Sequence, residues 1–232
     1  MSKPPQRHAL STRIWHWVNA LSFVILFMSG LNISNAHPHL YWGKWGFSPQ
    51  DAWLSVARFP GWATIPSHYS LAAARDWHVL FAWIFALGLL AYMLAALVNG
   101  HFVRDLVARR REWRPGIFAA EIREYLRFNF AHTGGKYGVM QKLAYALVVF
   151  ILLPLMIFSG MSISPGMGSA WPWLLDLFGG RQSARSIHFL AAWALFAFLL
   201  VHVALVLLTG PFGQMRAMIL GGQMDRTLDE AA

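Results

Sequence analysis

The chain of 232 residues contains no cysteine. This absence excludes disulfide bonds, iron–sulfur clusters, a thiolate-ligated haem and the Cys-x-x-Cys-His attachment of a c-type haem. Any metal centre in the protein must therefore be held by histidine, methionine, tyrosine or carboxylate side chains.

Charged residues are also scarce. They make up 12% of the chain and hydrophobic residues 57%, whereas a soluble domain carries about 25% charged residues. Four apolar stretches are long enough to cross a bilayer, which takes about 20 residues. They cover residues 13–34, 77–99, 139–162 and 186–209. We therefore predict an all-α integral membrane protein, with one domain over 1–232 folded as a four-helix bundle.

The few charges are distributed unevenly. Nine lysines and arginines lie between Gly100 and Lys142, but only three between Asn35 and Trp77. Because positively charged loops stay in the cytoplasm, we predict that the 100–142 loop and both termini are cytoplasmic. The first apolar stretch is too long for a signal peptide and is expected to remain as a span. The net charge of +9 reflects this topology, and nucleic-acid binding is not expected.

Two loops are predicted to have structure of their own. The extracytoplasmic segment 35–76 is rich in Trp, Pro and Gly, and we expect a compact cap with short helices, partly in the membrane interface. The cytoplasmic loop is expected to hold a helix after Pro115 that lies in the interface. The apolar residues near one face of this helix are Ile117, Phe118, Ile122, Tyr125, Leu126 and Phe130. The polar tail after Met218 is expected to be loosely ordered.

A sequence pattern occurs twice. The segments ARDWHVLFAW (Ala74–Trp83) and ARSIHFLAAW (Ala184–Trp193) open the second and fourth spans. The segments MSGLNIS (Met28–Ser34) and FSGMSIS (Phe158–Ser164) end the first and third. The offsets are 110 and 130 residues because the first extracytoplasmic segment is longer. Spans one and two therefore look like a copy of spans three and four, each pair forming a helical hairpin.

Four of the ten histidines lie inside predicted spans, where ionisable residues are costly and usually functional. His78 and His188 are matched positions of the repeat, so they share a depth near the extracytoplasmic surface. His202 follows His188 by 14 residues, which places it on the same helix face about 21 Å deeper. Its repeat partner is Tyr92. His16 begins the first span near the cytoplasmic surface and is therefore the candidate partner of His202.

Two histidine pairs, one near each membrane face, are what two haems b with bis-histidine ligation require. For any single histidine, hydrogen bonding to a neighbouring helix is an equally good interpretation, but the matched depths favour ligation. The remaining histidines lie in tails, loops or boundaries, and we interpret them as surface or interfacial residues. They are His8, His37, His39, His68, His101 and His132.

Three of the four intramembrane histidines have an arginine three residues before them, on the same helix face. These arginines are Arg13, Arg75 and Arg185. Each lies nearer the membrane surface than its histidine, where haem propionates emerge and accept bidentate hydrogen bonds. The alternative is an arginine that snorkels to the interface. Three glycines either admit a porphyrin close to the backbone or serve ordinary helix packing. They are Gly30, Gly88 and Gly160.

The four spans and their histidine spacing resemble the bacterial cytochrome b561 family over nearly the whole chain. This family includes the cytochrome b subunits of nickel–iron hydrogenases, formate dehydrogenases and thiosulfate reductases. The resemblance implies that His78 and His188 ligate an extracytoplasmic haem b, and His16 and His202 a cytoplasmic one. It also implies electron exchange with quinone in the bacterial inner membrane.

Catalysis is expected to belong to a partner, because the chain has no cysteines for iron–sulfur clusters. The resemblance implies an electron-transfer subunit between quinone and a periplasmic redox enzyme that docks on residues 35–76. The segments FPGWATIP and MSISP are similar to family members that accompany molybdenum-cofactor oxidoreductases. Three polar residues at cytoplasmic depth are candidates for the quinone site, although Gln141 is equally well a polar helix end. They are Asn19, Gln141 and Lys142.

Two other functions stay open on the sequence alone. A self-sufficient quinone-linked oxidoreductase, such as the superoxide oxidase that some cytochromes b561 resemble, would use the same haems without a dedicated partner. A proton-coupled transporter would use the intramembrane histidines as a relay. The second function is disfavoured because the spans contain almost no acidic residue, and Asp76 lies only at a boundary.

Overall fold

The computed structural model describes residues 10–98, 115–127 and 139–221. Four helical segments in these ranges are long and apolar enough to cross a membrane. They are Leu10–Ala36, Leu71–Val98, Val139–Ile163 and Arg181–Leu208. They match the four predicted spans, although three of them begin earlier than predicted. The prediction of a helical membrane protein with four spans is confirmed.

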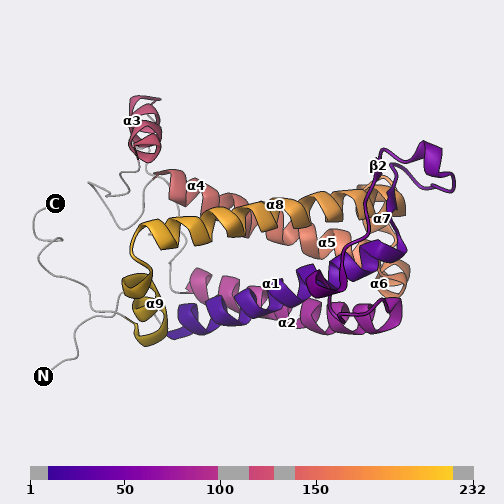
Figure 1. The fold of residues 1–232 in the computed structure, drawn as a ribbon, viewed down its shortest axis with the longest axis horizontal. Coiled ribbons are helices and arrows are strands. Elements are labelled where there is room, and N and C mark those ends of the chain that lie inside the picture. Colours follow the sequence, from indigo (N-terminus) through magenta and orange to yellow (C-terminus); the bar gives the residue numbers. More distant parts are fainter. Residues whose placement is uncertain (1–9, 99–114, 128–138, 222–232) are drawn as a thin grey trace, which may run out of the picture. The chain divides into compact units, whose positions relative to one another are not determined.

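Three of these spans are unbroken helices (Figure 1): α1 (Leu10–Ala36), α2 (Leu71–Val98) and α8 (Arg181–Leu208). The third span is divided into α4 (Val139–Leu147), a π-helical turn η4 (Val148–Leu152) and α5 (Leu153–Ile163). Pro154 explains the change of helix type. Proline has no amide hydrogen and cannot bond to the carbonyl four residues earlier, and the wider turn lies directly before it.

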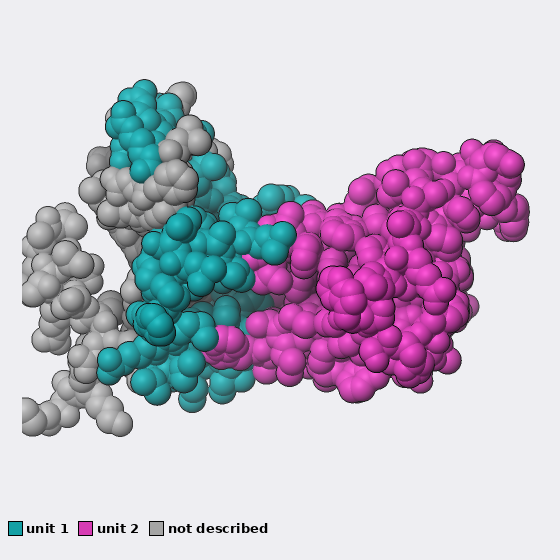
Figure 2. Space-filling model, in the orientation of Figure 1, with its two compact units in different colours: residues 1–16, 90–151, 200–232 teal, residues 17–89, 152–199 magenta. Residues whose placement is uncertain are grey.

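The chain divides into two compact units, coloured separately in Figure 2. Unit 1 consists of residues 1–16, 90–151 and 200–232, and unit 2 of residues 17–89 and 152–199. Each unit is described by itself below. The prediction of a single domain over 1–232 stays a prediction.

Small and polar side chains make up most of the fully buried residues of unit 2. Those with at most 1% of their surface exposed include Ser22, Ser29, Asn32, Ala74, Ser159, Ser162, Ala184 and Ser186. Large apolar side chains of the same helices point outward, such as Leu80, which is 55% exposed, and Leu87, which is 57% exposed. Small residues let helices approach closely where the surrounding solvent is itself apolar, so this arrangement is typical of a membrane bundle.

The segment between α1 and α2 has structure of its own. It contains the paired strands β1 (His39–Leu40) and β2 (Leu54–Ser55), which run antiparallel. It also contains two short 3-10 turns, η1 (Pro49–Asp51) and η2 (Gly61–Ala63). The strands were not predicted, because two residues are too few to show an alternating pattern. The location of this segment in the membrane interface stays a prediction.

Hydrogen bonds tie this segment to the first turns of α8. The hydroxyl of Ser186 donates to the Tyr41 carbonyl at 2.6 Å and accepts from the indole nitrogen of Trp53 at 2.9 Å. The backbone nitrogen of Gly43 donates to the Ser183 hydroxyl at 2.7 Å, and the Ser183 nitrogen donates back to the Gly43 carbonyl at 3.2 Å. The first turns of α8 are therefore covered by the cap.

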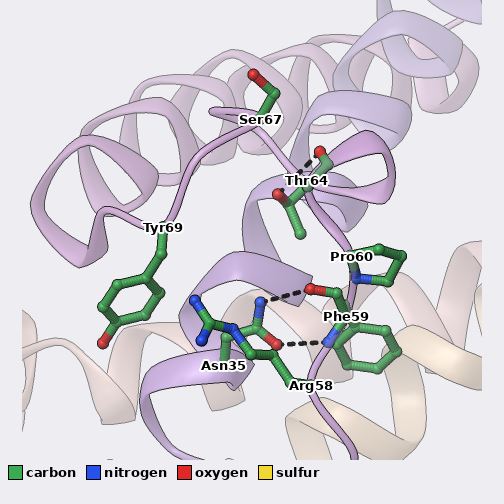
Figure 3. Close-up of a pocket in the computed structure, with 8 residues that line it drawn as sticks. Asn35, Arg58, Phe59, Pro60, Thr64, Ser67 and Tyr69 are labelled. Atoms are coloured by element: carbon green, nitrogen blue, oxygen red, sulfur yellow. Dashed lines mark hydrogen bonds between the residues drawn. The ribbon is translucent and has the colours of Figure 1, made fainter.

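A second set of hydrogen bonds ties the cap to the end of α1 (Figure 3). The Asn35 side chain donates to the Phe59 carbonyl at 3.0 Å and accepts from the Phe59 nitrogen at 2.7 Å. The Arg58 guanidinium lies over the Tyr69 ring, 5.2 Å from its centroid. These residues line an open hollow of about 360 Å³. Because the hollow is formed by the cap and the end of α1, it is separate from the histidines described below.

The other helices are short. They are α3 (Pro115–Leu126), α6 (Pro165–Ala170), α7 (Trp173–Leu177) and α9 (Pro211–Leu220). The first of these lies where a helix was predicted after Pro115, and its place in the membrane interface stays a prediction. Phe130, assigned to the same helix, lies outside the described residues. The Glu121 carboxylate accepts from the backbone nitrogens of Val139 and Met140 at 3.0 and 3.3 Å, which stabilises the start of α4.

The C-terminal helix α9 was not predicted. It begins at Pro211 after Gly210, whose φ of 98° is a left-handed conformation that favours glycine. It ends at Leu220, two residues beyond the point where the sequence predicts a loosely ordered tail. The residues after 221 lie outside the described part of the chain.

Candidate functional site

Unit 2 brings together the two histidines of the repeat. His78 on α2 and His188 on α8 have ring centroids 6.2 Å apart, and their ring planes are inclined at 62°. Both side chains are partly buried. The sequence prediction that these two residues form a pair is matched by this geometry.

Each ring in this pair contacts the neighbouring helix of its own hairpin. The Nδ1 of His78 lies 3.0 Å from the Ser29 hydroxyl on α1. The Nδ1 of His188 lies 2.9 Å from the Ser159 hydroxyl on α5. With Nδ1 engaged in this way, Nε2 is the nitrogen of each ring that is left to bind a metal.

Glycine follows each serine and makes room for the ring. A Cβ atom added to Gly30 would lie 3.5 Å from Cε1 of His78, and one added to Gly160 would lie 3.2 Å from Cε1 of His188. The third glycine, Gly88, faces Asn19 rather than a histidine, at 3.8 Å from its Nδ2. Two of the three predicted glycines therefore belong to the histidine site.

Unit 1 contains the second pair. The ring centroids of His16 on α1 and His202 on α8 lie 6.3 Å apart, with an interplanar angle of 56°. Beside them Trp15 stacks on Tyr92, with centroids 4.1 Å apart and ring planes inclined at 15°. Tyr92 is the residue that matches His202 in the repeat, so an aromatic stack stands where a symmetric repeat would place another histidine.

The spacing of both pairs suits a metal ion between the two rings. A metal–imidazole bond is about 2.0–2.1 Å long, so an ion bound by two opposed rings separates their centroids by about 6 Å. Among the residues that the structure describes, no group of three or more His, Asp or Glu side chains is placed to hold a metal. A porphyrin supplies four ligands to a haem iron, so a haem would need only the two imidazoles of one pair from the protein.

Two of the predicted arginines lie near each other and near His37. Burial lowers the pKa of His37, and the positive charges of Arg185 and Arg75 lower it further. The Nε2 of His37 is buried without a hydrogen-bond partner among the described residues. This gathering of basic groups suits an anionic group such as a haem propionate.

His37 was interpreted from the sequence as a surface or interfacial residue. The repeat gives no signal for it, because the matching position in the second hairpin is Met167. The two serines were also missed, yet a signal for them exists. Ser29 and Ser159 occupy the same position in MSGLNIS and FSGMSIS, each one residue before its glycine.

The other predicted site residues are dispersed between the units. Arg13 belongs to unit 1, where its guanidinium donates to the Ile219 carbonyl on α9 at 2.7 Å and its Nε is buried without a partner among the described residues. Asn19 is a buried residue of unit 2, whereas Gln141 and Lys142 are partly buried on α4 in unit 1. A quinone site at these three residues stays a prediction.

The fold and the paired histidines define a class of protein, the helical membrane cytochromes of the b type. A family model described as prokaryotic cytochrome b561 matches residues 7–221. The chain belongs to this family, and haem b is the cofactor that membership implies.

The chain is similar to curated relatives over most of its length. The chain is 28% identical to the putative protein-methionine-sulfoxide reductase subunit YedZ1 of Azospira oryzae, over 84% of this chain and 87% of the relative. It is 27% identical to the probable Ni/Fe-hydrogenase B-type cytochrome subunit of Cupriavidus necator, over 82% and 74% of the two chains. The corresponding subunit of Azotobacter vinelandii is 28% identical, over 83% and 76%.

The contact at Gly160 predicts the result of a substitution. We expect Gly160→Leu to push the His188 ring out of place, at an overpacking cost of about 1–3 kcal/mol, and to remove one haem per chain. Gly166→Leu is the matched control, because nothing lies within 4 Å of a Cβ at that position. Haem per chain in the purified variants is the measurement. Equal haem content in the two variants would contradict the placement of Gly160.

Proposed function

We propose that this chain is a di-haem b cytochrome that transfers electrons across the bacterial inner membrane between quinone and a periplasmic redox enzyme. The observation that carries the proposal is the presence of two histidine pairs, with ring centroids 6.2 and 6.3 Å apart. Neither pair has a third protein ligand among the described residues. The chain itself is an electron-transfer subunit, and substrate chemistry belongs to the partner.

The roles of the histidines follow from this spacing. His78 and His188 hold one haem, and His16 and His202 hold the other. A haem held by two histidines would supply one-electron exchange and would favour electron transfer over oxygen chemistry. The protein side chains fix the distance between the two ligands of each pair and exclude lipid from the gap.

The arginines are proposed to hold the propionates. Arg75 and Arg185 lie close enough to His37 for both charges to act on it. Among the described residues, Arg185 forms no ion pair with an acidic side chain. Its guanidinium donates to Gln182 at 3.1 Å. Arg13 is proposed to act in the same way in unit 1, where its Nε is buried.

The cap is the proposed docking surface for the partner. It is anchored to α8 by the hydrogen bonds of Ser186, yet it presents large aromatic side chains outward. Trp45 is 74% exposed, Phe47 84% and Trp62 83%. The relatives are described as subunits of a methionine-sulfoxide reductase and of hydrogenases, which supports an oxidoreductase partner. A molybdenum-cofactor enzyme is the class that the FPGWATIP segment favours.

The topology and the quinone site complete the proposal. Both termini and the 100–142 loop are placed in the cytoplasm on the distribution of positive charge. Asn19, Gln141 and Lys142 are the quinone candidates on the cytoplasmic side.

The first test counts haems. We expect about two low-spin b haems per chain, falling to one in His78→Ala and to one in His16→Ala, because each substitution removes one axial ligand. The measurement is a reduced-minus-oxidised spectrum with pyridine-haem quantification. His68→Ala, at an exposed histidine of the cap, is the control and should retain both haems. A haem-free wild-type protein, expressed with sufficient haem, would refute the cytochrome assignment.

The second test concerns charge at the extracytoplasmic site. Removing a positive charge near a haem stabilises the ferric form, so Arg185→Gln should lower one midpoint potential. The expected shift is roughly 50–70 mV, from unit charges about 10 Å apart at an effective dielectric constant near 20. Redox titration of the purified variant measures it. Arg58→Gln, which removes the exposed arginine over Tyr69, should leave both potentials unchanged, and equal shifts in the two variants would count against a propionate contact.

The third test concerns the electron donor or acceptor in the membrane. In proteoliposomes that contain the purified protein, a quinol should reduce both haems, whereas a quinol analogue that cannot be oxidised should not. Stopped-flow absorbance at the haem bands follows the reaction, and dithionite gives the full extent of reduction. Haems that dithionite reduces but quinol leaves oxidised would remove quinone from the proposal.

A further inference from the structure

The two serines beside the unit 2 histidines have matched surroundings. The Ser29 hydroxyl donates to the Leu26 carbonyl at 3.1 Å. The Ser159 hydroxyl donates to the Leu155 carbonyl at 2.6 Å and is 3.2 Å from the Met156 carbonyl. A hydroxyl has one hydrogen, so a serine that donates it to a carbonyl is left with lone pairs toward the imidazole. Each serine is thus an acceptor for an N–H on the ring.

The backbone carbonyls that the two serine hydroxyls contact also correspond between the hairpins. The Leu26 carbonyl accepts from the Ser29 hydroxyl, and the Met156 carbonyl lies 3.2 Å from the Ser159 hydroxyl. Leu26 and Met156 are themselves matched positions at the offset of 130 residues. A carbonyl oxygen only accepts, so in both hairpins the serine hydrogen goes to the backbone and the ring nitrogen must supply the hydrogen of the serine–imidazole contact.

The two hydroxyls are enclosed within unit 2. Ser29 and Ser159 both have 0% of their surface exposed, so water does not replace them as acceptors. A buried N–H without an acceptor is costly, and the tautomer with hydrogen on Nδ1 is therefore the one that this environment stabilises. That tautomer leaves the lone pair on Nε2, where a metal ligand needs it.

We propose that Ser29 and Ser159 are positioning residues that hold His78 and His188 as Nδ1–H tautomers and tune the electron density of the iron that these rings bind. The inference rests on the proposed haem at this pair. A hydrogen-bond acceptor on the distal N–H of a metal-bound imidazole raises the basicity of the ligand and fixes the ring plane. A more basic ligand stabilises the ferric form, so each serine lowers the reduction potential of this haem.

The experiment replaces the serines in the full-length protein and measures potentials and spectra. In Ser29→Ala and in Ser159→Ala, we expect one of the two midpoint potentials to rise and the other to stay unchanged. The expected change is up to about tenfold in the equilibrium constant for one-electron reduction, or about 59 mV. The double variant should shift further than either single variant. Electron paramagnetic resonance of the ferric protein should show altered g values for the same haem, since these report the orientation of the two imidazole planes.

Two further variants separate the hydroxyl from packing. Ser162→Ala removes another fully buried hydroxyl of α5, one that donates to the Ser159 carbonyl at 2.7 Å rather than contacting a histidine ring. It should leave the potential and the g values unchanged. Ser159→Thr keeps a hydroxyl and should restore the wild-type potential, including the case in which Ser159→Ala loses the haem altogether.

The role of the serines and the haem site itself can be refuted separately. Unchanged potentials and g values in the alanine variants overturn the role of the serines, and so does a shift of equal size in Ser162→Ala. A threonine variant that restores neither haem nor potential also overturns it, because the side-chain volume rather than the hydroxyl is then what matters. The proposed function has its own test in His78→Ala: two haems retained in that variant refute the haem site itself, whatever the serine variants show.

Discussion

The separation of the two imidazole rings in each histidine pair is the constraint on which the remaining structure depends. Centroids 6.2 and 6.3 Å apart leave space for a metal ion and little else between the rings. In unit 2 this spacing occurs where many of the fully buried side chains are small. A serine hydroxyl lies at Nδ1 of each of the rings of His78 and His188, and a glycine lies against the edge of each ring. In lipid these polar groups must be satisfied within the protein, and the histidines, serines and helix carbonyls satisfy one another.

At the end of the helices, buried polar side chains are likewise satisfied by hydrogen bonds, here to the backbone of the cap. Asn32 donates to the Pro66 and His68 carbonyls at 2.9 and 3.0 Å, so a buried amide of α1 fixes a loop that has no regular hydrogen bonding of its own. In the first turns of α8, the Ser186 hydroxyl likewise holds the cap by donating to the Tyr41 carbonyl. The cap is thereby tied to α1 and α8, and several of its aromatic side chains are exposed. A rigid loop with exposed aromatic residues is a suitable surface for a partner that must bring its own redox group close to a buried site.

The spans and the pairing of the histidines could be predicted because they depend on length, hydropathy and depth alone. The depth of a residue in a membrane helix follows from its position in the sequence, and the repeat fixed which residues share a depth. The contacts of Ser29 and Ser159 depend on how each helix is rotated about its axis, which depth does not determine. His37 lies near the arginines because of the path of the chain after α1. That path is irregular and produces no periodic pattern in the sequence. The π turn before Pro154 and the strands β1 and β2 are too short to leave a pattern.

The repeat explains one site and not the other. In unit 2 both ligands have the same surroundings, since each hairpin supplies a histidine, a serine at Nδ1 and a glycine at Cε1. In unit 1 the residues that match His202 and His16 in the other hairpin are Tyr92 and Ala146, so duplication cannot have built that pair. Trp15 stacks on Tyr92 in that unit, so the two pairs have different neighbours. Hydrogen bonding and polarity around the ligands set the potential of a haem. We therefore expect two haems held at these pairs to differ in reduction potential.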